Sequence, residues 1–193
     1  MHCGYSAKPV FLYARFMTKK DYKFCPKCGG NLAYKKTGFA EYPQCKKCGF
    51  VFYINSKPAT GAFIVDKQGK ILLATRGVEP SKGKWDFLGG FLESGEHPVD
   101  GLKREVKEEI GVDAEVGDFL GFFMDVYNHD KVSGEYVLNI FYLCKIKSEN
   151  YKLDREIAEV KWFAPDKIPW DDLAFKNTRD ALNYYLNDRK RKA

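Results

Sequence analysis

The chain of 193 residues is long enough for one ordinary domain and a small additional module. Hydrophobic residues make up 45% of it, which is enough for a packed core and excludes wholesale disorder. The formal net charge of +6 suits either a nucleic acid or an anionic phosphate substrate. No apolar run approaches the roughly 18 residues that a membrane-spanning helix needs.

The first 20 residues predict an N-terminal arm without regular structure. Residues 9–14 form an apolar run that is short and has no small-residue cleavage site after it, so a signal peptide is not predicted and we expect a cytoplasmic protein. Met17 opens the sequence M-T-K-K-D-Y-K, a more natural start. Residues 1–16 are therefore a hypothetical mis-assigned start or a dispensable arm.

Residues 21–55 contain two C-x-x-C pairs separated by 16 residues, a spacing that predicts a tetrahedral zinc site. The ligands are Cys25, Cys28, Cys45 and Cys48. Disulfides or a redox pair are the competing interpretations, but an intracellular chain disfavours the first and the paired motifs disfavour the second. Four thiolates leave no open position, so the Zn²⁺ is structural. The segment is similar to a zinc ribbon, and its lysines leave nucleic-acid binding open but not favoured.

Residues 56–193 begin a second domain. Residues 59–65 and 70–75 read as two strands of a hairpin around the turn 66–69. Arg76 and Lys84 follow, as candidate phosphate contacts or plain surface residues. Next comes Trp85-Asp86-Phe87-Leu88-Gly89-Gly90.

The stretch 90–112 reads G-F-L-E-S-G-E-H-P-V-D-G-L-K-R-E-V-K-E-E-I-G-V. Its residues 98–110 predict a helix, because proline suits the first turn and Gly111 can end it in the left-handed conformation. Glu105, Glu108 and Glu109 are spaced to share one face of that helix, and an apolar stripe on another face would dock it onto a sheet. Crowded carboxylates need protons, basic groups or hard divalent cations such as Mg²⁺. A solvated acidic face is the alternative.

Beyond the helix, residues 114–127, 135–147 and 159–163 read as strands, and residues 178–186 as an amphipathic helix. Residues 189–192 are four consecutive basic residues that predict a solvated tail. Strands and helices interleave while the hairpins imply antiparallel pairs, so we expect an α/β fold with a mixed sheet and helices on both faces.

The spacing G-x5-E-x7-R-E-V-x-E-E-x-G-V matches the Nudix box of the Nudix hydrolases at nine specified positions over 23 residues. The approach segment is similar too, with Leu88 where the family usually has proline. This resemblance implies an α/β/α sandwich over residues 58–190. It also implies a loop–helix–loop that binds Mg²⁺ or Mn²⁺ and hydrolyses a diphosphate linked to another moiety.

The resemblance also assigns roles to individual residues. Glu105 and Glu109 would be the main metal ligands, Glu108 a ligand or the base, and the carbonyl of Gly89 a further contact. Gly90, Glu96, Arg104 and Gly111 would be structural members of the motif. We expect Arg104 to point away from the carboxylates and to form a salt bridge with Glu96 or Glu93.

A general base outside the box is common in the family, and Glu156 matches such a position in its triphosphate-cleaving branch. Glu159 is a less favoured neighbour, and neither His97 nor His129 is supported as a base. Phe122, Phe123, Tyr127 and Tyr142 could stack a base, although aromatic residues in strands more often belong to the core.

The ribbon ahead of the box resembles the NADH pyrophosphatase group, but that group's S-Q-P-W-P-F-P-x-S signature is absent after the box. The resemblance implies cleavage of a small nucleotide of the NADH, ADP-ribose or FAD type. A nucleoside triphosphate pyrophosphatase is the alternative of the same class. A regulator that senses nucleotides or binds nucleic acid without catalysis is the alternative of another class. A homodimer is compatible with the sequence.

Overall fold

The computed structural model describes residues 22–37, 40–128 and 134–192. The N-terminal arm and the turn that carries His129 lie outside the described residues. Contacts divide the chain into two compact units, and the boundary that follows the cysteine-rich segment falls between Ile54 and Asn55.

The smaller unit is a two-stranded antiparallel sheet with the cysteine pairs at one end. Strand β1 (Leu32–Thr37) pairs with β2 (Ala40–Cys45) in a register that sets Leu32 opposite Cys45. In the turns that begin at Cys25 and Cys45, the amides of Gly29 and Gly49 donate hydrogen bonds to the carbonyls of Cys25 and Cys45, respectively. Both glycines have positive φ, which lets these tight turns form without strain.

The larger unit contains two three-stranded sheets. The first has the order β3 (Lys57–Ile64), β7 (Gly134–Ile146), β6 (Ala114–Asn128), with β3 parallel to β7. The second has the order β5 (Trp85–Asp86), β4 (Ile71–Arg76), β8 (Ile157–Phe163), with both pairs antiparallel. Short 3₁₀ helices η2 (Pro165–Lys167) and η3 (Trp170–Asp172) follow β8.

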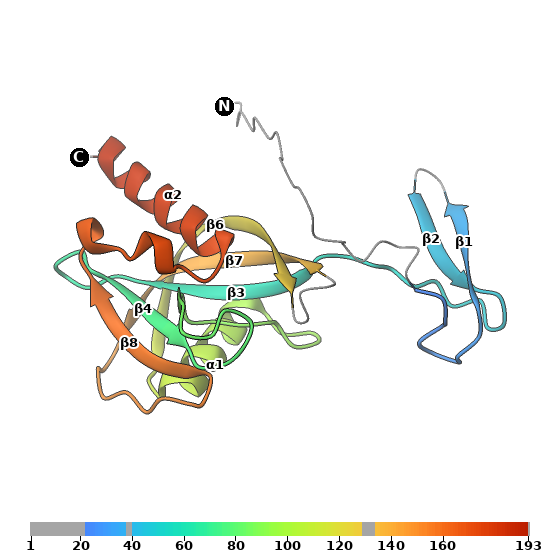
Figure 1. The fold of residues 1–193 in the computed structure, drawn as a ribbon, viewed down its shortest axis with the longest axis horizontal. Helices are drawn as coiled ribbons and strands as arrows, with labels where there is room; N and C mark the ends of the chain where they lie inside the picture. The colour runs from blue at the N-terminus through green and yellow to red at the C-terminus, as the bar shows by residue number, and fades with distance from the viewer. Residues whose placement is uncertain (1–21, 38–39, 129–133, 193) are drawn as a thin grey trace. The chain divides into compact units, whose positions relative to one another are not determined.

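Helices cover the two sides of strands β3 and β4, which gives the α/β/α layering (Figure 1). Side chains alternate along these strands: Ala62 and Leu72 pack with helix α1 (Pro98–Ile110), whereas Phe63 and Leu73 pack with helix α2 (Lys176–Lys192). Both strands are buried on both faces, which explains their continuous apolar sequence.

The predicted helix over residues 98–110 is confirmed to the residue, and the mixed α/β architecture is confirmed. The predicted hairpin over residues 59–75 is wrong, because β3 and β4 share only the bridge between Val65 and Ile71 and then diverge into different sheets. The free edge of β3 is instead taken by the loop 88–91, through bridges from Ala62 to Leu88 and from Ala59 to Phe91.

The C-terminal helix is longer than predicted. It continues to Lys192, so the basic residues 189–192 extend the helix rather than form a tail. Within the described part of the chain, no helix combines the length and apolar character that crossing a membrane requires.

Candidate active site

Helix α1 presents the acidic residues from a firmly anchored frame. The imidazole of His97 accepts a hydrogen bond from the amide of Val99 at the start, and Gly111, with φ of 73°, ends the helix in the left-handed conformation. Leu102, Val106 and Ile110 are fully buried against the sheets. Truncating one of these large side chains to alanine would cost about 2–5 kcal/mol, so the helix holds its polar face in place.

The loop at Gly89 and Gly90 brings backbone groups up to this helix. The amide of Gly89 donates to Oε2 of Glu109 at 2.8 Å, while the carbonyl of Gly90 accepts from the amide of Thr60 at 2.8 Å. Gly89 has φ of 137°, and a Cβ there would lie 2.2 Å from the carbonyl oxygen of Thr60. Only glycine fits this junction between β3 and the acidic face.

Arg104 lies among the carboxylates, which corrects the prediction that it points away from them. Its guanidinium donates twice to Glu96, at 2.8 and 2.9 Å, and its third nitrogen donates to Glu105 and Glu108 at 2.9 Å each. The fork geometry of arginine allows three partners at once, which the sequence argument overlooked. These bonds hold the pKa of Glu96 down at about 2 and raise the pKa of Arg104.

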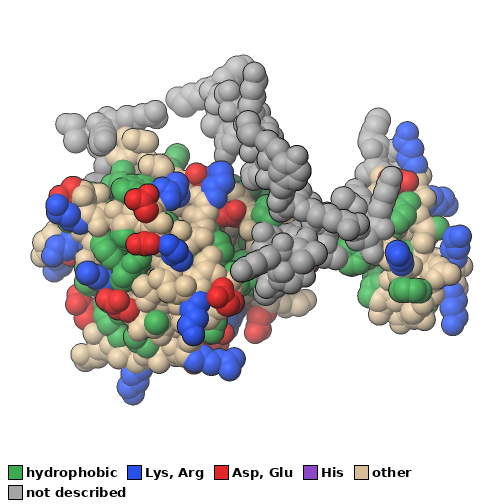
Figure 2. Space-filling model, viewed as in Figure 1, with side chains coloured by type: hydrophobic (Ala, Val, Ile, Leu, Met, Phe, Trp, Pro, Cys, Tyr) green, Lys and Arg blue, Asp and Glu red, His purple; other side chains and the backbone are tan. Residues whose placement is uncertain are grey.

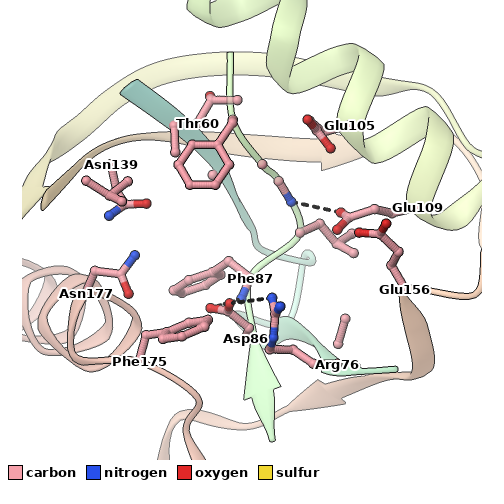
Figure 3. Close-up of a pocket in the computed structure, with 18 of the residues that line it drawn as sticks. Thr60, Arg76, Asp86, Phe87, Glu105, Glu109, Asn139, Glu156, Phe175 and Asn177 are labelled. Carbon is pink, nitrogen blue, oxygen red and sulfur yellow. Dashed lines mark hydrogen bonds and ion pairs between the residues drawn. The ribbon is translucent and has the colours of Figure 1, made fainter. Parts of the chain in front are cut away.

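Glu156 reaches the site because its loop is tied to the end of α1. The amides of Lys152 and Asp154 donate to the carbonyls of Ile110 and Glu109, both at 2.9 Å. The carbonyl of Glu156 also accepts from the amide of Gly77, next to the end of β4. The Glu156 carboxylate therefore lies beside that of Glu109 on the same side of the pocket, as Figure 3 shows.

These residues line a pocket of about 720 Å³, a size that suits a nucleotide. The described residues around it contribute eight carboxylates against two guanidinium groups: Asp86, Glu93, Glu105, Glu108, Glu109, Asp125, Asp154 and Glu156 against Arg76 and Arg104. Burial raises the pKa of Glu105, and burial together with the neighbouring carboxylates raises the pKa of Glu109 well above its ordinary value. The excess of negative charge is not neutralised by the protein itself.

The opposite end of the pocket carries residues that the sequence argument did not assign. They come from four separate places in the chain, and they are Asp86, Asp125, Asn139, Phe175 and Asn177. Burial raises the pKa of Asp86 to about 6. Asp86 could have been predicted as a pocket residue, because it lies in the segment that leads directly into the Nudix box. The others lie on β6, β7 and the region of α2, and no local motif identifies them.

The NUDIX domain family matches residues 55–185, more than half of the chain. The chain belongs to the Nudix family. A NAD-capped RNA hydrolase NudC from Pseudomonas aeruginosa is 26% identical over 167 residues, which cover 86% of this chain and 56% of that protein. The chain thus spans about half the length of this relative.

Two further similarities extend over much of the Nudix chain. An ADP-ribose pyrophosphatase from Methanocaldococcus jannaschii is 30% identical over 121 residues, covering 63% of this chain and 69% of that protein. The crystal structure of a Nudix hydrolase from Nitrosomonas europaea superposes with a TM-score of 0.71 at 28% identity, covering 88% of this chain and 93% of that one.

The Nudix family implies a divalent cation, and the donors in this pocket fit one. Mg²⁺ and Mn²⁺ take carboxylate, carbonyl and water oxygens. Glu105 and Glu109 supply carboxylates that are costly to keep ionised without a cation, as their raised pKa values show. A Cβ on Gly90 would lie 2.6 Å from Oε1 of Glu105, so a larger residue at position 90 would force that carboxylate to shift.

The four predicted substrate-contact residues divide into two pairs. Arg76 and Tyr127 line the pocket, with the Arg76 guanidinium 5.1 Å from the Phe175 ring and 3.8 Å from Asp86. Lys84 and Phe122 do not line it: Lys84 forms an exposed ion pair with Asp172 at 2.7 Å, and Phe122 packs on Phe119 at the surface. The Phe122 side chain is 58% exposed and lies outside the pocket lining.

The predicted zinc ligands form one cluster in the smaller unit. The sulfur atoms of all four lie within 4.8 Å of one another, at 3.8 Å between Cys25 and Cys48 and 3.5 Å between Cys28 and Cys45. Tetrahedral zinc with Zn–S bonds of 2.3 Å separates its sulfurs by about 3.8 Å, so the cluster fits Zn²⁺. The amides of Cys48 and Lys47 donate to the sulfur of Cys45 and lower the pKa of that thiol to about 6.

The smaller unit is rich in exposed lysines. Six of them are exposed in the described part of the smaller unit: Lys23, Lys27, Lys35, Lys36, Lys46 and Lys47. Figure 2 shows several of these basic side chains on the visible face of the unit.

Proposed function

We propose that this Nudix protein is a divalent-cation-dependent pyrophosphohydrolase that cleaves the diphosphate of a nucleoside diphosphate linked to another moiety. The observation that carries the proposal is the charge of the pocket, where eight carboxylates face two guanidinium groups. A diphosphate is itself anionic, so such a pocket admits it only together with cations.

Three groups of the chain would hold the cation: the carboxylates of Glu105 and Glu109 and, as in the family, the carbonyl of Gly89. When bound, Mg²⁺ or Mn²⁺ neutralises phosphoryl oxygens and lowers the pKa of a coordinated water. Arg104 fixes one oxygen of Glu105 and leaves the other oxygen available. The Gly89 amide does the same for Glu109.

Two further carboxylates are candidates for the base that accepts the proton of the attacking water. Glu108 is exposed at the mouth and bonded to Arg104, and Glu156 is exposed on the loop that faces Glu109. Both remain candidates for the general base, because both line the pocket. If Glu156 is the base, the second candidate substrate class, the nucleoside triphosphates, gains support, because the triphosphate-cleaving branch of the family uses a base at such a position outside the helix.

The relatives support a dinucleotide-type substrate. One is named for NAD-capped RNA and another for ADP-ribose, and both names describe a nucleoside diphosphate joined to a second group. The exposed lysines of the smaller unit are compatible with nucleic-acid binding by that unit, but a small-molecule substrate is the favoured assignment.

The experiment is product analysis by mass spectrometry with Mg²⁺ present. The panel is NADH, ADP-ribose, FAD and the nucleoside triphosphates. We expect mononucleotide products from at least one dinucleotide, and a fall in kcat of about 10²-fold or more in Glu109→Gln and in Glu108→Gln. Glu115→Gln, an exposed change outside the pocket, is the matched control. Cleavage of triphosphates alone would select the second class, and no cleavage of any compound would refute the proposal.

A further inference from the structure

The charge of the chain is divided unequally between its parts. Residues 22–54 contain six lysines and one acidic residue, Glu41, which gives a net charge of +5. Residues 55–193 contain 22 basic and 24 acidic residues, which gives −2. A zinc ion held by four thiolates adds −2 to the smaller unit and still leaves it positive. A basic module joined to an acidic domain points to a polyanionic partner for the module.

A third segment of chain extends the sheet of β1 and β2. Val51 forms an antiparallel bridge with Gln44 of β2, and the same register places Tyr53 opposite Tyr42, with ring centroids 4.9 Å apart. On the other side of β2, Lys35 of β1 lies opposite Tyr42. Residues directly opposite one another on antiparallel strands point to the same face of a sheet. Lys35, Tyr42 and Tyr53 therefore form one row across the three segments, the tyrosine row.

The other face of this sheet packs against the rest of the smaller unit. Tyr34 lies opposite Pro43, whose carbonyl accepts from the amide of Phe52, so these three side chains form the neighbouring row. Pro43 is fully buried. The Tyr34 hydroxyl donates to the carbonyl of Tyr22, and the Tyr22 ring lies 5.0 Å from that of Phe52. The tyrosine row lies on the opposite, outer face, where Tyr53 is 62% exposed.

The tyrosine row suits a single strand of nucleic acid. Tyrosine rings stack on bases, and a lysine beside them neutralises a phosphate. The rings of Tyr42 and Tyr53 are inclined at 64°, so each offers its own stacking surface rather than part of a common plane. The bases of a duplex are stacked on one another and cannot reach such rings. An acidic peptide suits the lysines but offers no series of planar rings to the tyrosines.

We propose that the outer face of this sheet binds single-stranded nucleic acid, with bases stacked on Tyr53 and Tyr42 and a phosphate held by Lys35. Binding does not depend on base sequence, because neither stacking nor phosphate contacts read the edges of the bases. This activity is separate from the hydrolysis of a small nucleotide. It attaches the Nudix domain to a nucleic acid and does not require that the nucleic acid be cleaved.

The test is fluorescence anisotropy of labelled oligomers with the zinc-loaded full chain, in buffer without Mg²⁺. The probes are oligo(dT) and oligo(U) of about 12 nucleotides and a DNA duplex of the same length. We expect the single strands to bind about tenfold or more tightly than the duplex. Tyr53→Leu should weaken single-strand binding about tenfold, as for the loss of one stacked base. Lys35→Gln should reduce the slope of log K against log salt by about 0.7.

Phe122→Leu and Lys67→Gln are the matched controls, because both residues are exposed and belong to the larger unit. They should leave the affinity and the salt slope unchanged. The zinc content of each variant, measured with a colorimetric chelator, reports whether the smaller unit is folded.

Three results would overturn the proposal. The first is equal or tighter binding of the duplex, and the second is unchanged single-strand affinity in a Tyr53→Leu variant that retains zinc. The third is binding of anionic vesicles or polyglutamate by a chain that binds neither oligo(dT) nor oligo(U). Mass-spectrometric assay of small-nucleotide cleavage tests the hydrolytic function independently, so failure of one activity leaves the other standing.

Discussion

The Asp86→Asn substitution should stabilise the larger unit at neutral pH. Burial raises the pKa of Asp86 from 3.8 to about 6 in the folded protein. The folded state therefore binds the Asp86 proton more tightly than the unfolded state does. Stability contributed by this group is fully present below about pH 4, falls as the pH rises through 6, and stays low above that.

The magnitude follows from the shift. A difference of about two units corresponds to about 3 kcal/mol at 1.36 kcal/mol per unit, and the low exposure of the side chain keeps solvent screening small. Asparagine avoids this penalty, and its carbonyl can still accept from Thr178. The variant should therefore be more stable than the wild type by up to about 3 kcal/mol at pH 7.5 and by almost nothing at pH 4.

Urea unfolding followed by tryptophan fluorescence measures this difference selectively. All three tryptophans, Trp85, Trp162 and Trp170, belong to the larger unit. The buffers should contain no added Mg²⁺, because a bound cation would change the ionisation of the neighbouring carboxylates. Asp166→Asn is the matched control, because Asp166 is exposed and pairs with Lys167 outside the pocket. A variant that is no more stable than the wild type at pH 7.5, or a difference that does not change with pH, would refute the reasoning.

Three other substitutions test the frame of the site and the metal cluster. Arg104→Lys cannot reproduce the four hydrogen bonds, so it should raise the Mg²⁺ concentration for half-maximal turnover severalfold and lower the Tm. Gly90→Ala should lower kcat about tenfold or more and raise the Mg²⁺ concentration for half-maximal turnover, because its methyl group would lie 2.6 Å from Oε1 of Glu105. If the Mg²⁺ concentration for half-maximal turnover does not change, that contact has no effect on the site. Cys25→Ser with Cys28→Ser should release zinc, measured with a colorimetric chelator. The tryptophan-detected unfolding transition of the larger unit should remain unchanged, and a loss of that transition in the double variant would contradict the independence of the two units.

The sequence predicted the parts of the site that a short stretch specifies. The residues 98–110 contain their own start, apolar stripe and stop, so both the helix and its acidic face could be located. The two C-x-x-C pairs were informative for the same reason, since their spacing alone determines that the sulfurs meet.

The remaining features depended on tertiary contacts. β3 and β4 look like a hairpin because both are apolar and a turn joins them, yet the loop 88–91 takes the edge of β3. Arg104 is adjacent in sequence to Glu105, and only the folded loop shows that its guanidinium binds the carboxylates. The end of the pocket away from α1 draws on β5, β6, β7 and α2, which no local pattern connects.

The central claim is that the acidic pocket admits a diphosphate only together with a divalent cation. The most direct measurement is calorimetric binding of α,β-methylene ADP, which resists cleavage between its phosphates, with and without Mg²⁺. We predict saturable binding with Mg²⁺, no measurable binding without it, and loss of the Mg²⁺-dependent signal in Glu109→Gln. Equal affinity in the presence and absence of the cation would contradict the claim.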